Sequence, residues 1–126
     1  MAVTAAPPEN ALEKLEKQPN IWIASVKPGG WPHLVPVWFV WHTGKIYIGT
    51  DPKSVKVRNL RNNPRAALAL EDGGSPVICE GSAREVQPPW SEDLLAAFMS
   101  KYEWDLTKES QYYNVWEITP EKWLVW

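Results

Sequence analysis

Six basic side chains are concentrated in one short stretch of a chain that is otherwise acidic. Residues 45–65 hold six lysines and arginines against one acidic residue, Asp51, although the whole chain carries a formal net charge of −2. The six are Lys45, Lys53, Lys56, Arg58, Arg61 and Arg65. Nucleic acid usually binds to a whole basic face, so it is not an expected partner. A small anionic ligand suits a segment of this size better.

The beginning of a helix gives such an anion a defined place. A helix is expected from Pro52 to Asn62, because Asp51 is a favourable N-cap residue and proline is favourable at the first helical position. In that geometry the backbone N–H groups of Lys53 and Ser54 have no partner and point out of the helix end. Together with the positive end of the helix dipole they form an anion site, for which phosphate is the expected ligand.

Side chains of this helix differ in whether they can reach the anion. The Ser54 hydroxyl and the Lys56 ammonium lie in the first turn. At about 100° per residue, Arg58 lies about 200° from Lys56 around an ideal helix, so both cannot hold the same phosphate. Ser54 and Lys56 therefore rank above Arg58. The alternative is that these charges only form a solvated helix face, as most charge runs do.

Other chemistries have less support in the sequence. The two histidines, His33 and His42, and the single cysteine, Cys79, lie in different predicted elements, so no metal site is expected. Cys79 alternates like a core residue, and no neighbouring base is evident that would activate it. The nine tryptophans could form exposed platforms for a sugar. Several of them alternate with charged residues, which favours inward packing or burial between two chains.

The surrounding sequence predicts the elements that position this helix. Strands rich in β-branched and aromatic residues are expected over residues 20–27, 32–42, 45–50, 65–72 and 77–86, with one or two more over 112–126. Helices are expected over residues 9–17 and, after a cap at Ser91, as far as Trp104. About six strands and two or three short helices, joined mostly by hairpin turns, favour a mainly β fold built as an antiparallel barrel.

The strand expected over residues 32–42 has two unusual features. Its apolar content is nearly continuous, which predicts that both of its faces are covered. Pro36 lies inside it and cannot donate a ladder hydrogen bond, so an edge position or a bulge is expected there.

Length and composition indicate the class of protein. The 126 residues suit a single domain over 1–126, of which about the first eight form a disordered lead-in. No apolar run approaches the length of a membrane span, and the start lacks the pattern of a signal peptide, so no membrane partner is expected. A single cysteine permits no internal disulfide, which favours a cytoplasmic location.

The order of motifs resembles the pyridoxamine 5′-phosphate oxidase-like superfamily of flavin-binding split β-barrels. A strand that opens with G-W-P-H at 30–33 and continues through P-V-W-F at 36–39 is followed by a hairpin that ends in Thr50. S-V-K-V-R-N-L at 54–60 and N-P-R at 63–65 come next. The resemblance covers about residues 21–86. It implies a six-stranded antiparallel split β-barrel that forms a homodimer, with the cofactor in grooves along the subunit interface.

The resemblance also assigns site residues by position. Val35, Pro36, Val37 and Trp38 would run along the cofactor ring, largely through their backbone; Gly49 and Thr50 would contact the cofactor; Ser54, Lys56 and Arg58 would hold its phosphate. A strand interrupted by Pro36 leaves backbone donors and acceptors free to meet the polar edge of a flavin. Core packing is the alternative role for Trp38.

Two departures from the family pattern bear on the substrate. Members that make pyridoxal phosphate carry an Arg and a Lys where this chain has Leu34 and Phe39, so that activity is not expected. Shorter relatives use FMN or the deazaflavin F420, and the motif at 54–60 resembles those seen with both; we expect FMN, with F420 as the alternative.

The expected function is therefore that of an oxidoreductase acting on a small molecule. No catalytic side chain is nominated, because a flavin itself carries the electrons. A flavin-binding or storage protein without turnover is the alternative. The sequence does not identify the substrate.

Overall fold

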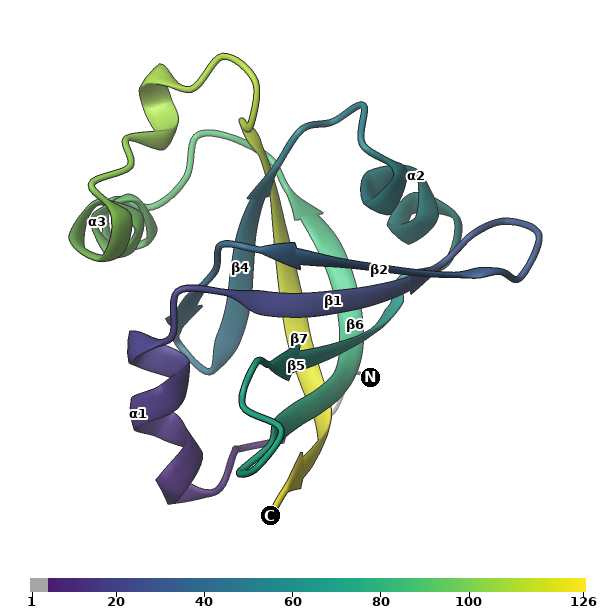
Figure 1. Cartoon of the computed structure of the whole chain (residues 1–126). Coiled ribbons are helices and arrows are strands. Elements are labelled where there is room, and N and C mark those ends of the chain that lie inside the picture. The colour runs from purple at the N-terminus through teal and green to yellow at the C-terminus, as the bar shows by residue number, and fades with distance from the viewer. Residues whose placement is uncertain (1–4) are drawn as a thin grey trace.

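The computed structural model describes residues 5–126. Within that range seven strands form one antiparallel sheet in the spatial order β2-β1-β5-β6-β7-β4-β3. The strands are β1 (Ile21–Val26), β2 (Pro32–Val37), β3 (Val40–His42), β4 (Lys45–Thr50), β5 (Arg65–Leu70), β6 (Val77–Val86) and β7 (Asn114–Val125). The sheet curls so that β1 and β2 cross over β4 and β7, which gives a half-barrel (Figure 1).

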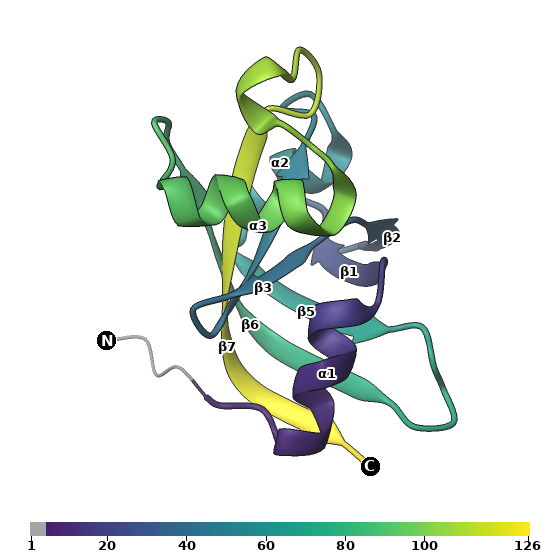
Figure 2. The ribbon, with the colours of Figure 1, turned by 90° about the vertical axis from the view of Figure 1, so that its left-hand side faces the viewer.

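Helices cover both ends of this half-barrel. α1 (Glu9–Lys17) lies at the end where the C-terminus emerges, whereas α2 (Val55–Asn62) and α3 (Glu92–Tyr102) lie at the opposite end (Figures 1 and 2). A 3₁₀ turn, η1 (Leu106–Lys108), follows α3 and leads back to β7. The connection from β4 to β5 and the connection from β6 to β7 therefore meet at the same end of the molecule.

The inward faces of the strands form the core that holds these elements. β1 alternates buried and partly exposed residues, so Ile21 and Ile23 point inward. Phe39, Ile46 and Ile118 are fully buried in the same cluster. Burial of each large apolar side chain stabilises the folded state by about 1.5–3 kcal/mol. This cluster therefore holds the strands, and with them the strand ends, in fixed positions.

The strand predicted over residues 32–42 is divided in two. β2 pairs with β1, and β3 pairs with β4, with Trp38 and Phe39 as the break between them. β2 is an edge of the sheet, and Pro36 lies opposite Trp22 there, as the proline predicted. The prediction that both faces are covered is wrong for a single chain, because Leu34 is 61% exposed on the outward face of β2.

The start of α2 differs from the prediction by three residues. The helix begins at Val55 with Ser54 as its N-cap, and not at Pro52 with Asp51 as cap. The Asp51 carboxylate instead accepts the Lys53 N–H at 2.8 Å, and the Asp51 carbonyl accepts the Ser54 N–H at 3.0 Å. The two N–H groups expected to be free are thus used in a turn before the helix. The unpaired N–H groups of the helix start belong to the residues that follow Ser54.

Other elements agree with their predicted ranges. α1 and β6 span residues 9–17 and 77–86, as predicted. Ser91 caps α3, because its hydroxyl accepts the Leu94 N–H at 3.2 Å. The sheet has seven strands and not about six, because the predicted strand 32–42 divides and residues 112–126 give one strand, β7.

The predicted lead-in over residues 1–8 lies partly outside the described residues, which begin at 5. Ala5 is held against β7: its N–H donates to the Pro120 carbonyl, and its carbonyl accepts from Trp123 Nε1, both at 2.9 Å. The first described residue is therefore hydrogen-bonded to the sheet. Among residues 5–126, no helix combines the length and the apolar character needed to cross a bilayer.

Candidate functional site

A cavity of about 440 Å³ lies where the ends of β2 and β4 meet the first turn of α2. It is lined by Asn20, Pro36, Val37, Trp38, Gly49, Lys56, Trp104 and Tyr112. Five of these eight were predicted as site residues from the sequence: Pro36, Val37, Trp38, Gly49 and Lys56. Its volume falls within the range of about 300–1,000 Å³ that is usual for small-molecule and cofactor sites.

Lys56 is the cationic group of this cavity. Burial lowers the pKa of Lys56 below its usual value, and the nearby Asp51 carboxylate opposes that shift. Among the described residues Lys56 forms no ion pair, whereas Lys45 and Arg61 of the same segment are paired with Glu117 and Glu85. A half-buried ammonium without an acidic partner is stabilised by an anionic ligand.

Ser54, which does not line the cavity, provides a second unsatisfied group two residues before Lys56 in the sequence. Its Oγ is buried and has no hydrogen-bond partner within residues 5–126. As the N-cap residue it lies where the unpaired N–H groups and the positive dipole end of α2 are found. A hydroxyl, an ammonium and unpaired N–H groups at the start of one helix are the types of group that bind a phosphate.

Like Ser54, the remaining predicted residues Val35, Thr50 and Arg58 lie outside the cavity lining. Val35 packs against the core from β2. The Thr50 hydroxyl is buried and lies 2.8 Å from the Asn114 carbonyl oxygen, so its side chain joins β4 to β7. Arg58 is exposed and lines a different cavity. The separation of Arg58 from Lys56 agrees with their positions around the helix.

Trp104 and Tyr112 were not predicted, and they come from the segment between α3 and β7. The Trp104 indole lies directly against the backbone of Gly49: a Cβ at position 49 would stand 2.6 Å from Cη2 of Trp104. Glycine is therefore required at this point of β4 by the close approach of the ring. The sequence carries no signal that joins residues 49 and 104.

Trp38 forms a wall of the cavity and is held from behind by α3. Its ring stacks on Tyr102 with the centroids 4.5 Å apart and the planes at 6°, and Trp104 meets it edge-on at 5.9 Å. The Tyr102 hydroxyl accepts the Phe39 N–H at 3.0 Å and lies 2.8 Å from the Pro19 carbonyl oxygen. The Phe39 N–H, which lies in the break between β2 and β3, is satisfied in this way, and Trp38 remains 51% exposed.

Glu109 organises the segment that carries Trp104 and Tyr112. Its carboxylate accepts Trp104 Nε1–H at 2.9 Å and the backbone N–H groups of Ser110, Gln111 and Tyr112 at 3.1–3.2 Å. The bonds from Gln111 and Tyr112 contribute most to a lowered pKa of Glu109. These hydrogen bonds hold the backbone of the segment that places Trp104 and Tyr112 at the cavity.

Other reactive groups of the chain do not form a site. Within residues 5–126, no group of three or more His, Cys, Asp or Glu side chains could hold a metal ion. Burial raises the pKa of Cys79 to about 12, so its thiol is not a nucleophile.

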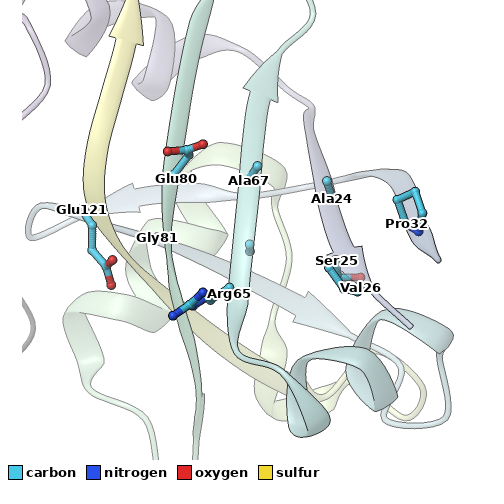
Figure 3. A pocket seen from close by; sticks show the side chains of 10 residues that line it. Ala24, Ser25, Val26, Pro32, Arg65, Ala67, Glu80, Gly81 and Glu121 are labelled. Atoms are coloured by element: carbon cyan, nitrogen blue, oxygen red, sulfur yellow. The ribbon is translucent and has the colours of Figure 1, made fainter. Parts of the chain in front are cut away.

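A second hollow, of about 500 Å³, lies on the outer face of the sheet (Figure 3). Small residues of three strands form part of its lining: Ala24 of β1, Ala67 of β5 and Gly81 of β6. Arg65 and Glu80 are among its polar lining residues. An antiparallel sheet with one uncovered face usually presents polar side chains there, whereas the outward residues of β1 are Trp22, Ala24 and Val26.

Known structures share this fold. The heme storage protein HutZ from Vibrio cholerae superposes with a TM-score of 0.78 at 18% identity, over 93% of both chains. A protein described as an F420 reductase superposes with a TM-score of 0.75 at 21% identity, over 93% of this chain and 98% of its own. At these identities the similarity shows the split-barrel fold alone.

One curated protein matches part of the chain. The valine–tRNA ligase of Mycoplasma genitalium is 32% identical over 82 residues, which is 57% of this chain and 9% of the ligase. The chain thus spans less than a tenth of that relative.

A family match covers nearly the whole sequence. The family described as pyridoxamine 5′-phosphate oxidase matches over residues 7–126, which includes every element from α1 to β7 and all lining residues of the Lys56 cavity. The chain belongs to the pyridoxamine 5′-phosphate oxidase family.

Proposed function

We propose that this protein binds FMN in the Lys56 cavity and acts as an oxidoreductase on a small-molecule substrate. One observation carries the proposal: within residues 5–126 the Lys56 ammonium has no ion-pair partner and the Ser54 hydroxyl has no hydrogen-bond partner. Both residues belong to the start of α2, where Lys56 lines the cavity bordered by the end of β2. Family membership supports it, because flavins are the typical cofactors of this fold.

The residues of the cavity fit the two chemical parts of FMN. Ser54 and Lys56 would hold the phosphate, since both lack partners within the described chain. Trp38 and Trp104 provide flat, apolar surfaces for the ring system. The end of β2 at the sheet edge offers backbone groups to the polar ring edge.

A bound flavin would supply the redox chemistry. The protein residues bind the phosphate, orient the ring and exclude water from one of its sides. No side chain that lines the cavity is an acid, and we assign no proton transfer to one.

A homodimer is part of the proposal, with the cofactor in a groove between the two chains. β2 is a free edge of the sheet, its residue Leu34 is exposed, and the exposed Trp38 follows its last residue. The outward residues of β1 beside the hollow shown in Figure 3 include the apolar Ala24 and Val26, and Ala67 of β5 lies next to them, with Arg65 and Glu80 as charged groups of the lining. An exposed apolar face next to the cavity is the expected appearance of a surface that a second copy covers. Light scattering at micromolar concentration tests this, and a monomer would contradict it.

F420 is the second candidate cofactor, favoured by the structural similarity to an F420 reductase. The same Ser54–Lys56 pair would hold its phosphate. A storage role without turnover differs in one property: the bound flavin would not be reduced by a substrate or by NAD(P)H. Cytoplasmic location, in a reducing compartment, completes the proposal and agrees with the single buried Cys79.

The test is identification of the small molecule that copurifies, by absorbance and mass spectrometry, followed by titration of the apoprotein with FMN. In Lys56→Ala the affinity for FMN should fall by about 10- to 100-fold, because a charge-assisted contact contributes about 1.5–3 kcal/mol. Lys53→Ala is the matched control, since this exposed lysine lines no part of the cavity. Equal affinity in both variants would place the phosphate elsewhere, and a copurified heme would replace flavin as the ligand.

A further inference from the structure

A separate cavity lies beside α2 and shares no residue with the Lys56 cavity. It measures about 350 Å³ and is lined by Lys27, Pro28, Gly29, Val55, Arg58 and Asn59. The first three residues belong to the turn between β1 and β2, which extends next to α2 (Figure 1). The last three belong to the first two turns of the helix.

This cavity is basic. Lys27 and Arg58 form no ion pair with any carboxylate of residues 5–126, and none of its lining residues is acidic. Arg61, one turn further along the same helix, is in contrast bound to Glu85 at 2.6 Å. Two cations that share a cavity without an acid repel each other, and an anion between them removes that repulsion.

Asn59 adds a buried amide that is only half satisfied. The residue is 1% exposed; its Nδ2 donates to Ser25 Oγ at 3.0 Å, while its Oδ1 has no partner in the described chain. A serine hydroxyl can donate as well as accept, so the amide can also turn over, with Ser25 donating to Oδ1. The amide NH₂ is then left as a donor for the cavity. A buried polar group without a partner is costly, and a ligand would satisfy it.

The start of α2 adds to the positive potential of this cavity. Val55 is the first residue of α2, and the N–H groups of a first helical turn have no partner within the helix. The positive end of the helix dipole therefore adds to the field of Lys27 and Arg58.

We propose that this cavity is a second oxyanion site, which binds the phosphate or carboxylate group of a small molecule through Lys27, Arg58 and the Asn59 amide. Arg58 presents a planar fork that matches the two oxygens of such a group. The cavity shares no lining residue with the Lys56 cavity, so the two sites can be tested separately. Arg58, which the resemblance assigned to the cofactor phosphate, is assigned here to the second site.

The experiment is a titration of ¹⁵N-labelled protein with inorganic phosphate at constant ionic strength, with succinate in a parallel series. We expect saturable chemical-shift changes at the Asn59 side-chain amide and at Arg58 Nε–H with at least one of the two anions. In the double variant Lys27→Gln/Arg58→Gln the affinity should fall at least tenfold. Lys53→Gln removes an exposed cation of the same segment outside both cavities, and it should leave the anion affinity measured at Asn59 unchanged. Lys56→Ala should also leave the affinity measured at Asn59 unchanged.

Three results would overturn the inference. Shifts that are confined to Ser54 and the residues around Lys56 would place the anion in the other cavity. Shifts that rise linearly and persist in the double variant would show unspecific screening. Displacement of phosphate from Asn59 by FMN would show that the two cavities serve one ligand. If FMN fails to bind while phosphate saturates Asn59, the flavin proposal fails and this one stands.

Discussion

Two groups of cations within residues 45–65 differ in whether they pair with a carboxylate in the folded chain. Lys45 and Arg61 lie 3.3 and 2.6 Å from carboxylates of β7 and β6, whereas Lys56 and Arg58 have no such partner among the described residues. Each group consists of one lysine and one arginine from the same basic segment. An anion site therefore depends on which cations remain without a carboxylate partner after folding, and not on how many cations the sequence contains.

The carboxylate that neutralises Lys45 belongs to a cluster with a structural role. Glu117 is buried on β7, accepts the Tyr47 hydroxyl at 2.7 Å and contacts Arg84 at 3.2 Å. Burial by itself would raise the pKa of Glu117, but the bonds from Tyr47, Arg84 and Lys45 outweigh it, and the pKa is lowered. At Lys56 the balance is reversed: burial lowers its pKa, and Asp51 only partly compensates.

The largest effect expected from this contrast is on Glu117. Glu117→Ala should lower the free energy of unfolding by about 2–3 kcal/mol, because it leaves Tyr47 and Lys45 without their acceptor. Urea unfolding measures this. Arg84→Ala is the control: its side chain is 67% exposed, so the loss should be about 1 kcal/mol or less. An equal decrease in the free energy of unfolding in the two variants would mean that Glu117 does not stabilise the fold more than its exposed partner Arg84 does.

Tyr102→Phe should have the next largest effect, on the wall of the cavity. The variant keeps the stacking with Trp38 but removes the hydroxyl that accepts the Phe39 N–H, so unfolding should become easier by about 1–2 kcal/mol. Trp38 would then be less firmly held, and the affinity for the cofactor should fall several-fold. Tyr113→Phe, on an exposed ring without a hydrogen bond in the described chain, should change neither quantity.

Lys56→Met should stabilise the apoprotein while it weakens cofactor binding. An unpaired, half-buried ammonium opposes folding, so the free energy of unfolding should rise by about 0.5–1 kcal/mol. Thermal unfolding without ligand gives this value, with Lys53→Met as the exposed counterpart. A destabilised apoprotein would show that Lys56 has a structural partner after all.

The smallest effect concerns pH. The pKa of Glu117 is lower in the folded than in the unfolded chain, so its contribution to stability is complete above about 4.5 and disappears as the pH falls through the lowered value. Glu117→Gln should therefore flatten the acid limb of the stability profile. If the free energy of unfolding falls just as steeply with pH below 4.5 in this variant, other carboxylates cause the loss of stability in acid.

Much of the fold could be predicted from local patterns. The helical pattern over residues 9–17 predicts α1, the pattern along residues 77–86 predicts β6, and Ser91 marks the start of α3. Pro36 correctly marked an edge, because a residue without an N–H is tolerated there. The N-cap of α2 was placed too early because Asp51 and Ser54 both suit that position, and only the turn made by Asp51 decides between them.

The candidate site could be predicted in part. Pro36, Val37, Trp38, Gly49 and Lys56 line the cavity as the resemblance implied, although their contact with a cofactor stays a prediction. Trp104 and Tyr112 were missed, because the segment after α3 reaches β4 and the turn before α2 only in the folded chain.

The sequence by itself determined the short helices and strands, the interruption at Pro36 and the concentration of positive charge before and along α2. Each of these depends on neighbours within a few residues. Tertiary structure alone decided which cations are free, because Lys45 and Arg61 meet their carboxylates across 72 and 24 residues. Ion pairing and burial depend on distances between remote segments, and those distances exist only once the sheet has closed around its core.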